Sequence, residues 1–193
     1  MELQHVNVKL LVKNPEEVDL EPLIPVFHSW IQGQIFEELL LDVADYRHVQ
    51  AGPGIVLIGH QANYSVDNTD SRLGVRYNRK AALDGSNQDR LKQAARAALT
   101  ACQRLEAESS LKGKLQFNGH ELEVFINDRL LAPNREATLE AVKSDFQGFS
   151  RKLFGGGDYS LSYAGGDPRG LFAVSVKSAR PFLVADLLNN LAS

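Results

Sequence analysis

Most of the chain is a succession of short segments in which apolar and polar residues alternate. In the first segment, residues 6–12, valine or leucine occupies every even position and mostly polar residues lie between them. A period of two is typical of a strand that buries one face. The same pattern predicts further strands at residues 39–46, 55–66, 73–77, 115–117, 122–126, 159–163 and 172–176. Strands of this kind form a sheet with one apolar face, and other elements of the chain must cover that face.

The cover is supplied by segments whose apolar residues recur at helical spacing. They lie at residues 20–31, 91–105, 139–153 and 182–191. Ser86 and Asp89 match a capping box, so the second helix should begin there, with Arg90, Lys92, Arg96 and Arg104 pointing away from its apolar stripe. Strand pairs followed by helices favour an α+β fold, a mostly antiparallel sheet with helices packed on one side.

The chain is predicted to form one domain over residues 1–193, since no linker rich in Pro, Gly or Ser divides it. A weak internal repeat relates residues 73–105 to residues 122–153, where LGVRYNRKAAL aligns with LEVFINDRLLA. Two interpretations stay open. The fold contains two similar strand-helix halves, or two ordinary strand-helix units resemble each other by chance.

The net charge of −3 hides a strong asymmetry along the chain. Residues 1–71 carry 3 basic and 11 acidic side chains, residues 72–114 carry 10 and 4, and residues 115–193 carry 8 and 9. Such segregation either creates a basic face that attracts anions or places acidic and basic segments side by side. We favour internal neutralisation, because an overall acidic chain argues against a nucleic-acid partner.

The sequence predicts a cytoplasmic protein without a membrane segment. Its N-terminal residues have no apolar stretch of the signal-peptide kind, and the apolar runs are far below the ~20 residues needed to cross a bilayer. The single cysteine, Cys102, excludes an intramolecular disulfide and a cysteine-based zinc site.

Residues 42–67 are the best candidate for a functional site, because polar groups are set among apolar strands there. His60 lies in the middle of the alternating set Val56 to Val66, so we expect it to be buried and paired. It is the candidate catalytic residue, with Asp42 or Asp45 to orient it. Opposite strand parity separates the two aspartates, and no metal-binding spacing is present, so neither a metal nor a cofactor is predicted.

Four further residues are candidates for ligand binding: Tyr46, Tyr64, Arg76 and Arg79. Because no motif supplies a reaction, the leading hypothesis is a non-catalytic protein that binds a small ligand near residues 42–67 or assembles with itself. The alternative is an enzyme of hydrolase or lyase type. In that case His60 would act as general base and Arg76 or Arg79 would hold an anionic substrate.

Overall fold

The structure is a computed structural model that describes residues 1–164 and 166–193. An eight-stranded antiparallel sheet forms its centre, in the order β2-β3-β4-β5-β1-β6-β8-β7. The strands are β1 (Val6–Val12), β2 (Leu40–Tyr46), β3 (Gly54–Gly59), β4 (Ala62–Asp67), β5 (Gly74–Arg79), β6 (Phe117–Ile126), β7 (Tyr159–Tyr163) and β8 (Phe172–Ser178). The helices are α1 (Leu23–Gly33), α2 (Asn87–Ala107), α3 (Glu136–Leu153) and α4 (Val184–Ala192).

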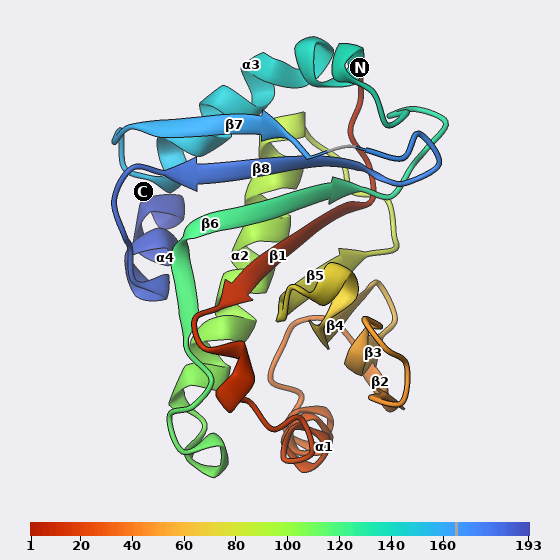
Figure 1. Ribbon diagram of the computed structural model, residues 1–193, viewed down its shortest axis with the longest axis vertical. Helices are drawn as coiled ribbons and strands as arrows, with labels where there is room; N and C mark the ends of the chain where they lie inside the picture. Colours follow the sequence, from red (N-terminus) through yellow and green to blue (C-terminus); the bar gives the residue numbers. More distant parts are fainter. Residues whose placement is uncertain (165) are drawn as a thin grey trace.

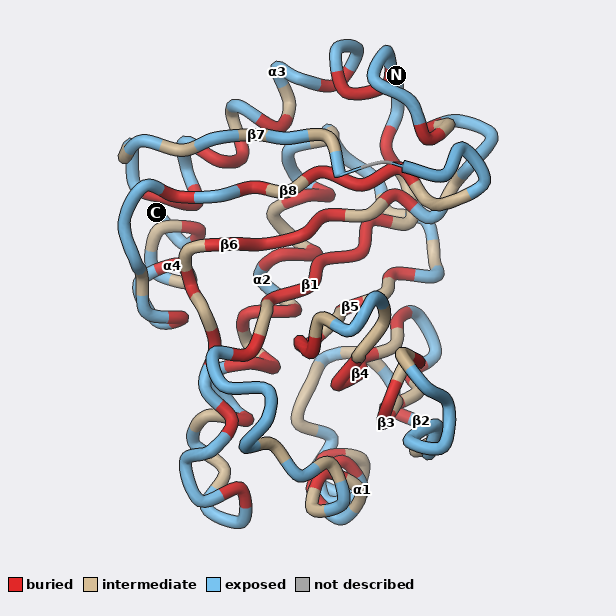
Figure 2. Tube along the Cα trace, viewed as in Figure 1, coloured by how far each residue is buried: buried red, intermediate tan, exposed pale blue. Residues whose placement is uncertain are grey.

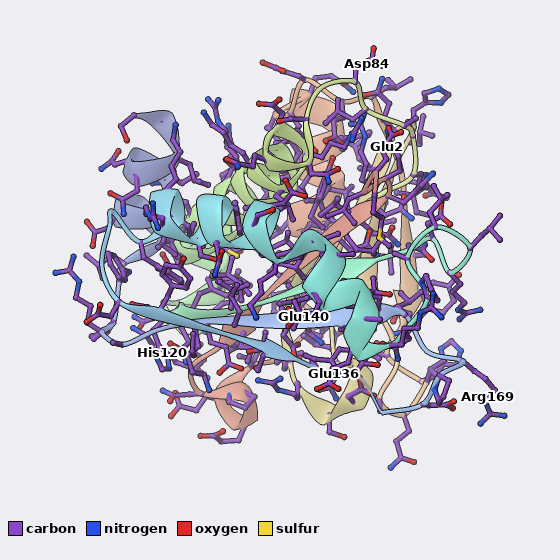
Figure 3. The ribbon with its side chains drawn as sticks, turned by 90° about the horizontal axis from the view of Figure 1, so that it is seen from above. Glu2, Asp84, His120, Glu136, Glu140 and Arg169 are labelled. Atoms are coloured by element: carbon purple, nitrogen blue, oxygen red, sulfur yellow. The ribbon has the colours of Figure 1, made fainter. Side chains whose placement is uncertain are left out.

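The α-helices cover one face of the sheet. The long helix α2 crosses β1 and β5, while α1 packs on β2 and β3, α3 on β7 and β8, and α4 on β6 (Figure 1). Seen from above, α2 and α3 lie on the same side of the strands (Figure 3). The predicted α+β fold with an antiparallel sheet is therefore confirmed.

The core lies between this helical layer and the sheet. Figure 2 shows the central strands β1, β6 and β8 as largely buried. On β1, the even residues Val8 and Leu10 are fully buried beneath α2. The odd residues lie on the opposite face, which we call the open face because in the described chain it carries single 3-10 turns but no α-helix. One of these turns is η2 (Thr69–Ser71), whose Thr69 carbonyl accepts a hydrogen bond from Lys9 of β1.

The helix α2 follows its prediction except at one residue. Ser86 and Asp89 form the predicted capping box, and Arg96 and Arg104 are exposed. Arg90 was predicted to point away from the apolar stripe of the helix, as Arg96 and Arg104 do, yet it is not exposed like them. Its side chain is buried, donates from Nε to the Leu83 carbonyl and pairs with Glu2 at 2.7 Å. These partners from the loop before α2 and from the N-terminus compensate the burial of its charge.

The predicted long strand at residues 55–66 is in fact a hairpin. The strands β3 and β4 pair antiparallel, with His60 and Gln61 as the two residues between them. Gly59 permits the tight turn, because a Cβ there would lie 2.5 Å from the Ala62 carbonyl oxygen. The turn reverses which residues face the core: Ile55 and Leu57 are buried before it, and Ala62, Tyr64 and Val66 after it.

A second difference concerns residues 115–126. The two strands predicted at residues 115–117 and 122–126 are not separated by a turn, because β6 runs without a break from Phe117 to Ile126, with an irregular register against β1. The segments of the weak repeat contain β5 with α2 and β6 with α3, and β5 and β6 flank β1. A duplication of this unit stays a prediction. Among the described residues, no helix has the length and apolar character needed to span a membrane.

Candidate functional site

A groove of about 860 Å³ opens between α2, the chain that links α1 to β2, and the ends of β4 and β5. Its lining comes from four separate stretches of sequence: Ile35, Phe36, Glu37, Glu38, Gln61, Tyr64, Arg79, Leu83, Asp89, Lys92, Gln93, Arg96, Ala97 and Thr100. A volume of this size is sufficient for a small organic molecule. A second hollow, between the chain before α1 and the loop after α2, has only about 130 Å³.

Aromatic packing fixes the wall formed by residues 35–38. After α1 ends, Gln34 adopts a left-handed backbone conformation (φ 44°) that turns the chain. Phe36 then stacks on Tyr64 with ring centroids 4.6 Å apart and meets Trp30 edge to face at 5.5 Å. Such aromatic pairs contribute about 0.5–1.5 kcal/mol beyond the area they bury. This wall is consequently attached to both α1 and β4.

Glu38 and two tyrosines form a hydrogen-bonded cluster at the groove, in which Glu38 and Tyr64 belong to the lining and Tyr77 is fully buried. Tyr64 and Tyr77 stand directly opposite each other on β4 and β5, and both hydroxyls donate to Glu38 Oε1, at 3.1 and 3.2 Å. Gln93 of α2 donates to the Tyr77 hydroxyl at 3.0 Å. In the described part of the chain, Glu38 forms no ion pair, and its covered Oε2 has no hydrogen-bond partner.

The two phenols are held in their protonated form. Burial, followed by the charge of Glu38, raises the pKa of Tyr64 far above its usual value. Burial likewise raises the pKa of Tyr77. Both hydroxyls therefore act as hydrogen-bond donors at neutral pH, and neither is activated as a base or nucleophile.

The charged residues of the groove lie on two different walls. Glu37 and Glu38 belong to the chain before β2, whereas Lys92 and Arg96 belong to α2. No ion pair joins the two sets within the described residues. At the end of β5, Arg79 is buried and donates to the carbonyls of Ala81 and Ala82 at 2.9 and 3.5 Å.

The prediction that His60 faces the core is wrong. It occupies the turn between β3 and β4, where its side chain is exposed and its backbone N–H donates to the Leu39 carbonyl at 2.8 Å. No hydrogen bond or ion pair links its imidazole to Asp42 or Asp45 in the residues that the structure describes. The structure therefore does not bring together the three candidate catalytic residues.

Asp42 and Asp45 lie on β2, the edge strand of the sheet. The carboxylate of Asp42 accepts a hydrogen bond from the Val43 N–H at 2.8 Å, and Asp45 binds Arg47 through both oxygens. These hydrogen bonds from Arg47 lower the pKa of Asp45 to about 2. Charged side chains that occupy edge N–H groups hinder pairing with another strand. Protection of the edge strand is a structural role that Asp42 and Asp45 can have without taking part in a reaction.

The four predicted ligand-binding residues are distributed over three places. Tyr64 and Arg79 line the groove, Tyr46 is exposed at the end of β2, and Arg76 lies on the open face. Phe36 and Glu38, from the chain before β2, and Gln93, from α2, were not among the predicted site residues. The sequence does contain a signal for the pairing of Tyr64 with Tyr77. Both tyrosines occupy apolar positions in the alternating patterns of residues 55–66 and 73–77, which predict two successive strands.

Several kinds of site find no support in the described residues. No group of three or more His, Cys, Asp or Glu side chains is arranged to hold a metal ion. Cys102 is fully buried on α2, and burial raises the pKa of its thiol well above the usual value. Such a thiol is inert as a nucleophile. Comparisons with protein-family models, with curated proteins and with solved structures found no match for this chain.

Proposed function

We propose that this protein is a non-catalytic binding protein for a small zwitterionic molecule, one that carries both an ammonium and an acidic group. One observation carries the proposal. The walls of the groove are acidic at Glu37 and Glu38 and basic at Lys92 and Arg96, yet no ion pair connects them in the described chain. A ligand with both charges satisfies both walls at once.

The cluster around Glu38 supports the ammonium half of this assignment. Its carboxylate receives hydrogen bonds from two neutral phenols and forms no ion pair with a described residue. Attraction between charges is stronger in a partly enclosed groove than in bulk water. A positively charged group bound near Glu38 therefore gains more there than it would on the open surface.

The balance of charges in the lining limits the class of ligand. The lining contains three acidic residues, Glu37, Glu38 and Asp89, and three basic ones, Arg79, Lys92 and Arg96, with Asp89 on α2 beside Lys92. A polyanion such as a nucleic acid would meet repulsion from the acidic wall. A neutral or zwitterionic molecule of the amino-acid or short-peptide class meets none.

Isothermal titration with free amino acids and with an alanyl-alanine dipeptide tests the proposal. We expect saturable binding of at least one of these probes. Glu38→Gln and Arg96→Gln should each weaken it at least tenfold, equivalent to about 1.4 kcal/mol. Arg151→Gln is the matched control, because Arg151 is exposed on α3, outside the groove. Equal binding by the groove variants and the control, or no binding of any probe, would contradict the proposal.

We also propose that the chain self-associates in the cytoplasm. Leu130 and Leu131 follow one another in the loop before α3 and are 90% and 48% exposed. Adjacent exposed leucines favour contact with another protein surface. A lone, buried cysteine fits a reducing compartment. Native mass spectrometry tests association: we expect a dimer that Leu130→Ser converts to monomer, and a monomer at all concentrations would refute it.

A further inference from the structure

The open face of the sheet carries an ordered array of polar side chains. Asn78 of β5 pairs with Asn7 of β1, which in turn lies opposite Phe125 of β6. In the next row, Arg76 lies opposite Lys9, which faces Glu123. These residues occupy the middle of the sheet, three adjacent strands wide, on the side away from α2.

Most charges of this face are neutralised by neighbours. Lys9 Nζ reaches across β5 to Asp67 Oδ1 at 2.6 Å, passing Gly74, which has no side chain to block it. Arg72 pairs with Glu121 at 3.0 Å and with Glu123. Lys177 adds a second cation to Glu121 at 3.1 Å.

Arg76 is the exception. In the described residues its guanidinium makes no hydrogen bond and no ion pair, and its Nε is covered. It lies over the ring of Phe125, with Cζ 4.5 Å from the ring centroid. Burial lowers the pKa of Arg76, and the charges of Asp67, Glu123 and Asp70 oppose this effect without contacting it.

Unpartnered amides lie beside this guanidinium. Asn7 is fully buried, and neither its Nδ2 nor its Oδ1 has a partner among the described residues. The Oδ1 of Asn78, directly across from it, is also covered and unpartnered. Each buried polar group left without a hydrogen bond costs about 1–3 kcal/mol. Three such side chains side by side are therefore an expensive arrangement in the folded chain.

We propose that the open face holds a second binding site, independent of the groove, which takes the carboxylate or phosphate group of a small molecule. Arg76 supplies the cationic fork, and the amide groups of Asn7 and Asn78 supply further donors. The planar guanidinium matches the two oxygens of such an anion with parallel hydrogen bonds. Phe125 holds the guanidinium in place by its cation–π contact.

The neighbouring acids favour this assignment over an internal partner. Asp67 is engaged by Lys9, and Glu123 is engaged by Arg72. Asp70 is exposed in η2 and forms no ion pair with described residues. An anion that binds Arg76 therefore displaces no hydrogen bond or ion pair that this side chain makes with the described residues. It also gives Asn7 Nδ2 an acceptor, which this amide nitrogen lacks among the described residues.

NMR titration of the isotopically labelled full chain tests the site, with inorganic phosphate and benzoate as probes and sodium chloride as an ionic-strength control. The Arg76 Nε–Hε signal and the side-chain amide signals of Asn7 and Asn78 should shift and saturate with phosphate, benzoate or both. Preference for one probe identifies the anion. Arg76→Gln should weaken binding at least tenfold, whereas Arg151→Gln and the groove variant Glu38→Gln should leave it unchanged.

Two results would overturn this assignment. In one, chloride shifts the same signals as far as the two probes do, which means general screening. In the other, Asp70→Asn shifts the Arg76 Nε–Hε signal as strongly as a probe, which means that Asp70 is its partner in solution. Because Glu38→Gln acts only in the groove, failure of this site and failure of the zwitterion site are distinguishable.

Discussion

At the scale of single residues, partners decide what a polar side chain does. His60 and Lys9 illustrate this in opposite directions. The sequence pattern placed His60 in the core, but the turn of the hairpin carries it into solvent. Lys9 has the outward position of an alternating strand, yet it is only 2% exposed because Asp67 accepts from its ammonium. The burial of Lys9 could not be read from its own strand, because it depends on Asp67 of another strand, and the exposure of His60 depends on a turn that the apolar alternation concealed.

The buried pair of Lys9 and Asp67 gives a prediction about stability. Asp67→Asn leaves the ammonium of Lys9 buried without its counter-charge, and we expect a loss of about 3–5 kcal/mol in the free energy of unfolding. The double variant Lys9→Met/Asp67→Leu removes both charges and should recover most of this loss. Urea denaturation measures both variants. A double variant as unstable as the single one would show that the pair contributes more than mutual neutralisation.

A prediction for His60 follows from its exposure in the turn. His60→Leu should change the free energy of unfolding by less than about 0.5 kcal/mol, as for an ordinary surface residue. Chemical denaturation checks this, with Leu57→Ala in the adjacent strand as a control. Leu57 is fully buried, and its truncation should cost about 2–5 kcal/mol. A large loss for His60→Leu would contradict the exposed position of this side chain in the turn.

At the scale of elements, helices and their limits were more predictable than strand pairs. The capping box of α2 is visible in the sequence as Ser86 and Asp89, and both reciprocal hydrogen bonds form. The hairpin of β3 and β4 was missed because the even residues from Val56 to Val66 alternate with the odd ones through the turn without a break, and they were therefore counted as one face. Val56 and Ile58 in fact lie on the open face, half-buried. Gly59 was the only local signal.

The buried stripe of α2 gives the prediction for this scale. Leu105 is 1% exposed and belongs to the hydrophobic core. Leu105→Ala should cost about 2–5 kcal/mol, because a cavity remains where the side chain packed. Arg104→Ala, the neighbouring exposed position, should cost far less. Thermal and urea denaturation compare the two. A loss below about half a kcal/mol at Leu105 would contradict the assignment of this face to the core.

At the scale of the whole molecule, the fold class was predictable and the sites were not. Alternating strands and amphipathic helices are local patterns, and they led to the correct α+β architecture. The groove is assembled from residues 35–38, the end of β4, the end of β5 and one side of α2. These segments meet because β4 and β5 are neighbours in the sheet, α2 packs on β5, and Phe36 stacks on Tyr64. The charge asymmetry along the chain is likewise balanced by contacts between distant segments. Arg90 and Arg72 belong to the basic residues 72–114. They pair with Glu2 and Glu121, which belong to the two other segments.

The buried tyrosines of the groove make the stability of the whole fold sensitive to alkaline pH. Tyr64 and Tyr77 have raised pKa values in the folded chain, so they keep their protons when the unfolded chain releases them above pH ~10. The folded state then binds more protons than the unfolded state, and the free energy of unfolding must fall as the pH rises. Below pH ~10 this contribution is fully present. Between its pKa in the unfolded chain and its raised pKa in the folded chain, each tyrosine removes at most about 1.4 kcal/mol per pH unit.

Thermal denaturation between pH 8 and pH 11 tests this linkage. Lysines also titrate in this range, so the comparison that matters is between the wild-type chain and the variants Tyr64→Phe and Tyr77→Phe. Each variant loses a hydrogen bond to Glu38 at every pH, which lowers the whole curve. It also loses one of the protons that the fold retains, so its stability should decline less steeply above pH ~10. Parallel curves for all three proteins would mean that the phenols ionise as readily in the folded chain as in the unfolded one. That result would contradict the buried, hydrogen-bonded cluster of Tyr64, Tyr77 and Glu38.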